Sequence, residues 1–513
     1  MAGVVMLHRA PPIHIRAPTG SRNVQHVRGR GTVEEAYRRK SAPLSNALVS
    51  AHDCVGDMST IKPRASRVCV LRRVCMATAT GIFHYYRDGN ATLTPIVFDQ
   101  RYGHIFSFGH VAPRGGCEDL LPLNKHVRYK RHVRWSPHIV DGALPHGAPL
   151  LRQLHVLSAP FVPTNLGHLV WEEAFPLLLA MAQLGVYEER AVVLRTHNCS
   201  ESVKPAKPPT ASAARLCRKF VDGFVRPLQG GEAAAQGAGR GVASAPLTTI
   251  DSLRQRYARA GAPYVCFRRL LAGGYHEMFN APAHAGKEPL LALYRHRVLA
   301  FHGLAPARGP PPPITAHRCL LVKKEGRRGL HNFDEVARFV RGGCDGGCTE
   351  LSAGGASGLS SSQDPRSLRD APRVVEIEFH TMSIREQLAA VSSATIAVSP
   401  PGGVSMILPF LPEGAHAVLV NYMLAKEAKK RGLDADESAC SRCSLTMEAA
   451  LWRHVRHVRK LYYQVWEPSD FARGKAGRDA AVVVKLPRLS FLLRVALNTM
   501  AEAVDDADAE DTT

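Results

Sequence analysis

The sequence predicts an α/β protein with two domains, and three observations support this prediction. After a proline run at residues 309–313, short apolar strand patterns alternate with amphipathic helix patterns, as in a parallel sheet covered by helices. Before the run, strand and helix patterns are also mixed, and the run lies where a linker between domains is expected. The chain has 513 residues, of which 45% are hydrophobic and 21% charged, a composition typical of about two to four globular domains.

The second half of the chain has the more regular pattern. In order, its expected elements are a strand at 319–322, a helix at 332–340, a strand at 374–379, a helix at 384–393, a strand at 395–398, a glycine turn at 399–403 followed by a short apolar helix, and a strand at 415–422. Asn332 is expected to cap the first helix, and Glu335 to complete a capping box. Parallel units of this kind bind ligands outside the carboxyl ends of their strands.

The first half is less regular. Strands are expected at 154–157, 192–194 and 264–267, and helices at 166–184 and 290–304. Glycine-rich segments at 230–246 and 342–363 are interpreted as loop insertions. The expected organisation is a disordered basic arm (1–60), a first α/β domain (61–285), an interdomain helix and linker (286–313), a Rossmann-like domain (314–425), a helical segment (426–500) and an acidic, solvated tail (501–513).

The charge of the chain indicates an acidic partner. Lys and Arg number 66 against 44 Asp and Glu, a formal net charge of +22. Nucleic acid, an anionic membrane and phosphorylated small molecules all fit this surplus. Residues 452–466 hold basic side chains interleaved with aromatic ones, which could bind single-stranded nucleic acid by charge and stacking. The helical spacing of Trp452, Val455 and Leu461 favours instead a packed face, and no nucleic acid is expected as partner.

Cysteine content and hydropathy say little about the cellular compartment. Twelve cysteines are too few for a disulfide scaffold. The pairs Cys344/Cys348 and Cys440/Cys443 could form a split zinc site, but local disulfides or free thiols are favoured. No apolar run approaches the about 18 residues of a transmembrane helix, so no membrane anchor is expected in this chain. No metal site is predicted either.

Two features of the second half predict a phosphate site. Gly402 and Gly403 allow close approach of a ligand to the backbone, and the helix that follows offers unpaired N–H groups. Lys323, Lys324, Arg327 and Arg328 follow the first strand of the same unit, so their side chains are expected at the same edge of the sheet. For Asn332, a contact with the ligand and a role as helix cap are equally favoured.

A third cluster lies at the start of the helix expected at 166–184. His168 and Glu172 are four residues apart, on one helix face. Such a pair can remove a proton from a hydroxyl nucleophile if both groups face a cleft. Otherwise the pair is a surface contact worth a few tenths of a kcal/mol. On spacing alone, the surface contact is the better interpretation.

Taken in order, these clusters resemble glycosyltransferase family 61, which includes EGF-domain O-GlcNAc transferases and plant xylosyl- and arabinosyltransferases. Asn165, His168 and Glu172 resemble the family's Asn-x-x-His-x-x-x-acid segment, and Cys266-Phe267 with Gly273 resemble its Cys-Phe strand before a glycine. Lys324, Arg328 and Asn332 resemble its Arg-x-x-x-Arg-x-x-x-Asn segment, and Glu386-Gln387 its Glu-Gln on a helix. Pro401-Gly402-Gly403, followed by residues 411–415, resemble its His-Gly-Ala turn before Leu-Pro-x-Gly-Ala. The resemblance covers about residues 150–425, with large inserts.

The resemblance implies a GT-B-like fold of two Rossmann-like domains, with the acceptor side in the first domain and the donor in the second. It implies an inverting hexosyl- or pentosyltransferase that moves a sugar from a nucleotide-sugar donor to a hydroxyl of a protein or glycan, without a metal or other cofactor. It also implies a membrane-anchored glycoprotein of the Golgi and secretory pathway, although this sequence carries no visible anchor or signal.

The resemblance assigns roles to particular residues. Glu172 would be the catalytic base, with Glu173 the less favoured candidate and His168 an orienting group or an alternative base. The residues that would bind the donor are Lys324, Arg328, Asn332, Glu386, Gln387, Gly402, Gly403 and Ser405.

One departure from the family pattern affects the donor site. The histidine of the family's glycine turn is replaced by proline, at Pro400 or Pro401 according to the alignment. The loss of this imidazole removes a group that would contact the donor. A non-catalytic homologue that binds glycans or nucleotide sugars therefore stays as an alternative. A nucleic-acid-binding protein stays as another, because its partner would explain the positive charge of the Arg- and His-rich segments.

Overall fold

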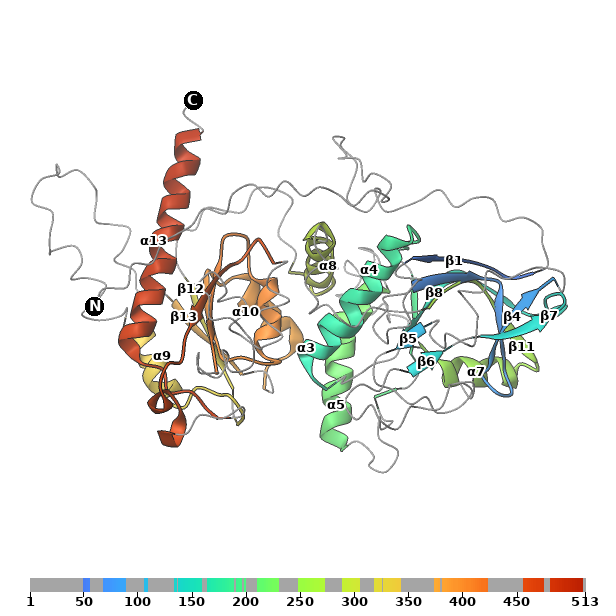
Figure 1. The fold of residues 1–513 in the computed structure, drawn as a ribbon, viewed down its shortest axis with the longest axis horizontal. Helices are drawn as coiled ribbons and strands as arrows, with labels where there is room; N and C mark the ends of the chain where they lie inside the picture. The colour runs from blue at the N-terminus through green and yellow to red at the C-terminus, as the bar shows by residue number, and fades with distance from the viewer. Residues whose placement is uncertain are drawn as a thin grey trace, which may run out of the picture.

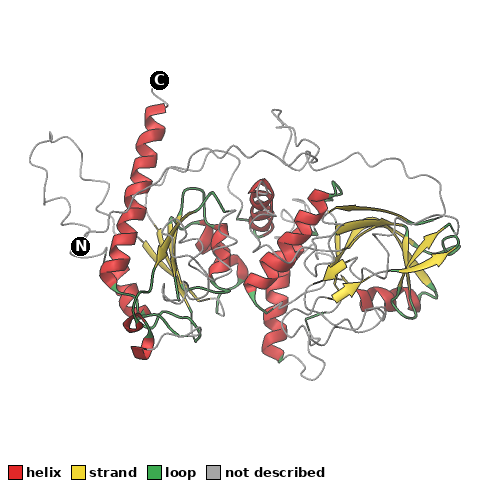
Figure 2. Ribbon diagram, viewed as in Figure 1, coloured by secondary structure: helices red, strands yellow, loops and turns green. Residues whose placement is uncertain are grey.

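The computed structural model shows a mixed α/β protein in which two groups of strands are separated by helices (Figures 1 and 2). It describes residues 49–55, 68–88, 106–108, 133–135, 137–158, 164–188, 191–195, 198–199, 210–229, 248–272, 288–304, 318–324, 326–342, 373–378, 381–422, 455–474 and 480–510. Most of the basic arm, both glycine-rich segments, Gly273 and the cysteines at 344, 348, 440 and 443 lie outside these residues.

In the second half, five described strands form an all-parallel sheet in the order β13-β12-β14-β15-β16. The strands are β12 (Arg318–Lys323), β13 (Arg373–Glu378), β14 (Ile396–Ser399), β15 (His416–Val420) and β16 (Arg459–Tyr463). Every residue of β14 and β15 is buried, as expected for the centre of a parallel sheet covered on both faces. The predicted parallel α/β unit is confirmed.

The helices of this half follow the expected periodicity. Helix α9 (Phe333–Arg341) buries Phe333, Val336, Ala337 and Val340, and α10 (Ile384–Ser392) buries Ile384, Gln387, Leu388 and Val391. Both sets have the i, i+3, i+4, i+7 spacing of one helix face. The glycine turn leads into η7 (Ser405–Phe410), a buried 3₁₀ segment.

The strand order creates a topological switch point. The chain passes from β12 through α9 to β13 on one side, and then through α10 to β14 on the other side of β12. In sequence order from β12, this is the 2-1-3-4-5 arrangement of doubly wound sheets, whose ligands bind between the carboxyl ends of strands 1 and 3. Here those ends are Lys324 and the glycine turn after Ser399.

In the first half, the described strands form one mixed sheet in the order β10-β9-β8-β11-β3-β4-β7, with β2 also paired to β11 and β1 to β2. The strands are β1 (Ala51–Val55), β2 (Val68–Arg72), β3 (Val74–Ala77), β4 (Phe83–Arg87), β7 (His138–Asp141), β8 (Leu150–Ser158), β9 (Val192–Arg195), β10 (Thr248–Thr249) and β11 (Tyr264–Ala272). A short pair, β5 (Phe106–Phe108) and β6 (Val133–Trp135), lies apart from it.

The helices of the first half lie largely between the two sheets (Figure 1). The predicted helix at 166–184 consists of α3 (Leu166–Leu169), a π-helical turn η1 (Val170–Ala174) and α4 (Phe175–Gln183). The others are α5 (Ala211–Phe220), the π-helical turn η2 (Val221–Val225), η3 (Arg226–Leu228), α7 (Ile250–Arg259) and α8 (Glu288–Phe301). No described helix is both long and apolar enough to span a membrane.

Four sequence-based expectations differ from the structure. Strand β1 lies within the arm expected to be disordered, because its residues pair in register with β2. Residues 459–463 form an edge strand rather than a helix, paired with β15. The acidic tail expected from residue 501 is not a separate segment, because helix α13 (Leu486–Glu510) continues through most of it. Two short 3₁₀ turns, η9 (Pro468–Asp470) and η10 (Ala472–Gly474), precede this helix. The fourth difference concerns the cap at Asn332.

The side chain of Asn332 does not cap α9. Its Nδ2 donates to the carbonyl of Val484 (2.9 Å) and its Oδ1 accepts from the Val484 amide (2.8 Å), while Nδ2 also contacts Oε2 of Glu335 (2.8 Å). The predicted capping box is therefore wrong. A backbone segment 152 residues away takes both ends of the amide instead.

Candidate functional site

The carboxyl ends of β12 and β14 are joined by a lysine. Lys324 directly follows β12, and its Nζ donates to the carbonyl of Pro401 in the glycine turn (2.7 Å). A β-carbon on Gly402 would lie 3.0 Å from the same Nζ. The two phosphate-binding features predicted from sequence therefore meet directly across the switch point.

The glycine turn depends on its two glycines for different reasons. Gly402 has a φ of 109°, which side-chain-bearing residues rarely adopt. Gly403 has no room for a side chain, because a β-carbon would lie 2.8 Å from Oδ1 of Asn165. Ser405 then anchors the turn, since its buried hydroxyl donates to the carbonyl of Gly402 (2.8 Å).

The start of α3 packs against this turn. Asn165 caps α3 by accepting from the amides of Gly167 (2.9 Å) and His168 (3.4 Å). A β-carbon on Gly167 would lie 2.8 Å from the side chain of Met406, and the indole of Trp171 donates to the Met406 carbonyl (2.9 Å). The structure thus brings together the Asn165–His168 segment, Lys324 and the glycine turn, which are far apart in the sequence.

Arg328 lies in the loop after β12 with an unusual backbone conformation, φ 59°. The carbon of its guanidinium lies 4.3 Å from the centre of the Tyr422 ring, which is 6% exposed. Tyr422 follows β15 by two residues, so it belongs to the same carboxyl edge of the sheet. Lys324, Arg328, Gly402, Gly403 and Tyr422 are called the switch-point cluster below.

The two adjacent glutamates of η1 are not equivalent. Glu173 is buried at 4% exposure and receives bonds from Arg195 Nε (2.9 Å), Arg195 Nη2 (3.2 Å) and the Ser158 hydroxyl (2.9 Å). Both of its oxygens therefore serve an internal ion pair, and it is poorly placed to act as a base. Glu172 lies in the same π-helical turn, and His168 lies in α3 with a partly exposed side chain.

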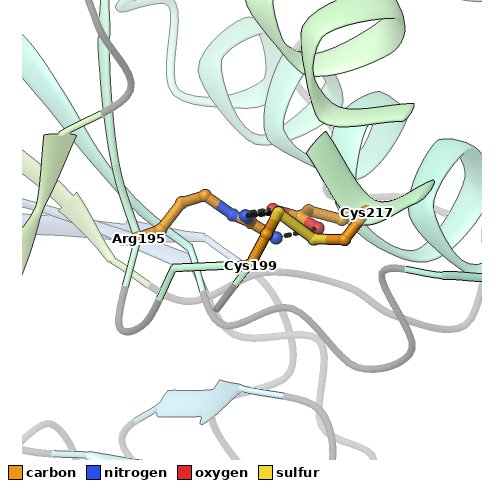
Figure 3. Close-up of a disulfide and its surroundings, with 4 residues drawn as sticks. Arg195, Cys199 and Cys217 are labelled. Carbon is orange, nitrogen blue, oxygen red and sulfur yellow. Dashed lines mark hydrogen bonds and ion pairs between the residues drawn. A yellow bond between two sulfur atoms is a disulfide. The ribbon is translucent and has the colours of Figure 1, made fainter. Parts of the chain in front are cut away.

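A disulfide lies beside this ion pair. Cys199 and Cys217 are bonded, which ties the segment after β9 to α5 (Figure 3). Arg195 Nη1 contacts Cys199 Sγ at 3.8 Å. A second disulfide, Cys75–Cys266, joins directly paired residues of β3 and β11.

Glu386 and Gln387 are engaged within and around α10. Glu386 forms a reciprocal capping box with Ser383, and the hydrogen bonds from Ser383 hold the pKa of this carboxyl below its ordinary value. Gln387 is buried and donates to the carbonyl of Met382 (2.9 Å). Lys219 of α5 donates to the same carbonyl, so this end of α10 contacts the first half of the chain.

Sequence reasoning missed Tyr422 and Arg195. Tyr422 follows β15 by two residues, and an aromatic residue just beyond the carboxyl end of a parallel strand was the available signal. Arg195 ends the apolar run of β9, where a charge entering the core requires a buried partner. The disulfides had no local signal, because their cysteines are 191 and 18 residues apart.

Among the described residues, no group of three or more His, Cys, Asp or Glu side chains is gathered as a metal ion would need. No protein-family model matches the chain, and no curated protein is significantly similar to it. The function is therefore inferred from the fold and the switch-point cluster.

Proposed function

We propose that this protein is a glycosyltransferase similar to family 61, with a GT-B-like arrangement of two Rossmann-like domains. It would move a hexosyl or pentosyl group from a nucleotide-sugar donor to a hydroxyl of a protein or glycan, with inversion. The observation that carries the proposal is the 2.7 Å contact between Lys324 and Pro401 across the switch point. This contact brings the Lys324 ammonium group and the glycine turn together at the edge of the sheet where doubly wound folds bind nucleotides.

The donor diphosphate fits the chemistry of the switch-point cluster. Lys324 and Arg328 supply positive charge, and the glycine turn supplies backbone amides to which a phosphate can come close. During transfer, negative charge grows on the departing nucleoside diphosphate. Fixed cations and amides stabilise that charge without reorganising.

The acceptor side is assigned to the start of the helix that begins at α3. The acceptor hydroxyl oxygen would attack the anomeric carbon as the bond from that carbon to the diphosphate oxygen breaks. The hydroxyl proton would pass to Glu172, with His168 as an orienting group. Asn165 supports this assignment, because it contacts Gly403 and also caps the helix that carries His168.

The disulfides support an oxidising compartment. Cys75–Cys266 and Cys199–Cys217 are formed in the structure, and such bonds persist mainly in secreted proteins and in the lumen of the secretory pathway. A Golgi location would agree with the family resemblance.

A second candidate is a non-catalytic protein that binds nucleotide sugars. It is favoured by the proline that replaces the family's histidine, because proline has no imidazole to contact the donor. Such a protein would keep the cations and the glycine turn but release no product.

Turnover of radiolabelled UDP- and GDP-sugars, with and without a glycoprotein acceptor fraction, tests the proposal. The wild type is expected to transfer or hydrolyse at least one donor. Glu172→Gln should lower that rate by about 10²–10⁴-fold, whereas the matched variant Glu288→Gln, on α8, should keep it. Binding of a donor without any turnover would select the second candidate, and near-normal turnover by Glu172→Gln would remove Glu172 as the base.

A further inference from the structure

Arg328 adopts a backbone conformation that non-glycine residues rarely take. Its φ of 59° is in the left-handed region, where the β-carbon crowds the neighbouring carbonyl. Such strain persists only where the surroundings impose it, and it is concentrated at ligand-binding and active sites. Contacts around Arg328 must therefore hold it in this conformation.

The backbone on the C-terminal side of Arg328 is held by the segment before α13. The amide of Val482 donates to the carbonyl of Gly329 (2.9 Å), and the amide of His331 donates to the carbonyl of Val482 (2.7 Å). A β-carbon on Gly329 would collide with the carbonyl of Lys324, so the loop is tightly folded. These contacts fix where the Arg328 side chain leaves the backbone.

Tyr422 holds the other end of the side chain. The centre of its ring lies 4.3 Å from the carbon of the Arg328 guanidinium, and Tyr422 is itself buried and held through its backbone. The Tyr422 amide donates to Oδ1 of Asn421 (2.8 Å), and Nδ2 of Asn421 donates to Oε1 of Gln464 (3.0 Å). Asn421 is buried, so this support lies inside the sheet rather than in a surface loop.

We propose that Tyr422 is a positioning residue that sets the plane of the Arg328 guanidinium for binding of a diphosphate. Stacking uses the face of the guanidinium, while its N–H donors leave from the edge. Bidentate binding of phosphate oxygens requires that edge to be oriented in advance. The inference rests on the proposed function and adds a residue to its donor site.

Isothermal titration calorimetry on the full chain tests this role, with UDP, GDP and inorganic pyrophosphate as ligands. Tyr422→Phe keeps the ring and should change each Kd by less than about twofold. Tyr422→Leu removes the aromatic face and should weaken both nucleotide and pyrophosphate binding about tenfold, as expected for a stacked cation in a partly buried site. In an Arg328→Ala background, Tyr422→Leu should have no further effect.

Pyrophosphate separates positioning from direct contact, because it has no nucleoside. If Tyr422→Leu weakens nucleotide binding but not pyrophosphate binding, Tyr422 touches the nucleoside and the positioning role is overturned. A full effect of Tyr422→Leu in the Arg328→Ala background, or no effect at all, also overturns it. If Tyr422→Leu has no effect but the wild type binds a nucleotide, the proposed function stays intact. If the wild type binds none of the three ligands, the positioning role and the proposed function are both excluded.

Two controls keep the test free of folding artefacts. Tyr422→Phe and Tyr422→Leu should both unfold cooperatively in a thermal melt, and binding is compared at a temperature where each variant is folded. Arg473→Ala is the matched arginine variant. Arg473 also has a left-handed φ, 64°, but it is exposed in η10, and its loss should leave all three Kd values unchanged.

Discussion

At the scale of single residues, the adjacent glutamates of η1 show how burial separates roles that sequence spacing cannot. The family resemblance implies Glu172 as the preferred base and Glu173 as the less favoured candidate. In the structure, Glu173 and Arg195 form an ion pair whose side chains are 3% and 2% exposed. A hydroxyl from Ser158 also binds the carboxylate. Glu173 thus joins α3–α4 to the sheet, and its role is structural.

This pair makes a prediction about stability. Arg195→Ala leaves a buried carboxylate without its cation and should lower the free energy of unfolding by about 3–5 kcal/mol. Urea denaturation measures the loss. The control Arg456→Ala breaks the more exposed Arg456–Glu288 pair and should cost less than about 1 kcal/mol. Equal costs for the two variants would contradict the internal role of Glu173.

At the scale of helices and strands, the sequence predicted the elements whose local pattern agrees with their packing. Helices α9 and α10 each bury one periodic face, and β14 and β15 are short apolar runs between turns. The glycine turn and Lys324 could be placed together because carboxyl ends of parallel strands share an edge.

The expectations that differ from the structure concern residues whose partners lie far away in the sequence. β16 was expected to be helical because Trp452, Val455 and Leu461 share a helical spacing, but pairing with β15 determined its conformation. Asn332 was expected to cap α9, but its amide binds the backbone of Val484. Tyr422 and Arg328 are far apart in the sequence, and only the fold brings the ring next to the guanidinium.

The docking of α13 on the parallel sheet should depend on pH. His416 of β15 is buried, and its Nε2 contacts the hydroxyl of Thr499 in α13 (2.9 Å). Burial, with a smaller contribution from Arg459, lowers the pKa of His416 from 6.5 to about 4. Below pH 6.5 the unfolded chain gains a proton that the folded chain does not, so stability should fall as the pH decreases from 6.5 to 4.

His416→Gln tests this dependence. The variant should lose less free energy of unfolding between pH 7 and 5 than the wild type, by on the order of 1 kcal/mol, as measured by urea denaturation at each pH. His146→Gln, which removes an exposed imidazole, is the control and should follow the wild type. An unchanged pH dependence in His416→Gln would exclude His416 as the titrating group.

At the scale of the whole molecule, the two halves share one core. Phe410 of η7 lies among rings of the first half, with centroids 5.8 Å from Phe224, 6.1 Å from Tyr294 and 6.4 Å from Trp171. The buried cluster that contains these rings continues from Val68 to Val458. This packing sets the glycine turn against the start of α3, so the residues proposed to bind the acceptor and the donor lie next to each other.

We propose that the switch-point cluster binds a nucleoside diphosphate through Lys324. The most direct measurement is the affinity of UDP and GDP for the wild type and for Lys324→Ala, determined by titration calorimetry at two salt concentrations. We expect measurable binding of at least one nucleotide by the wild type and an affinity about tenfold or more lower for the variant, since a charge-assisted contact to phosphate is removed. No binding by the wild type, or equal affinities in the two proteins, would contradict it.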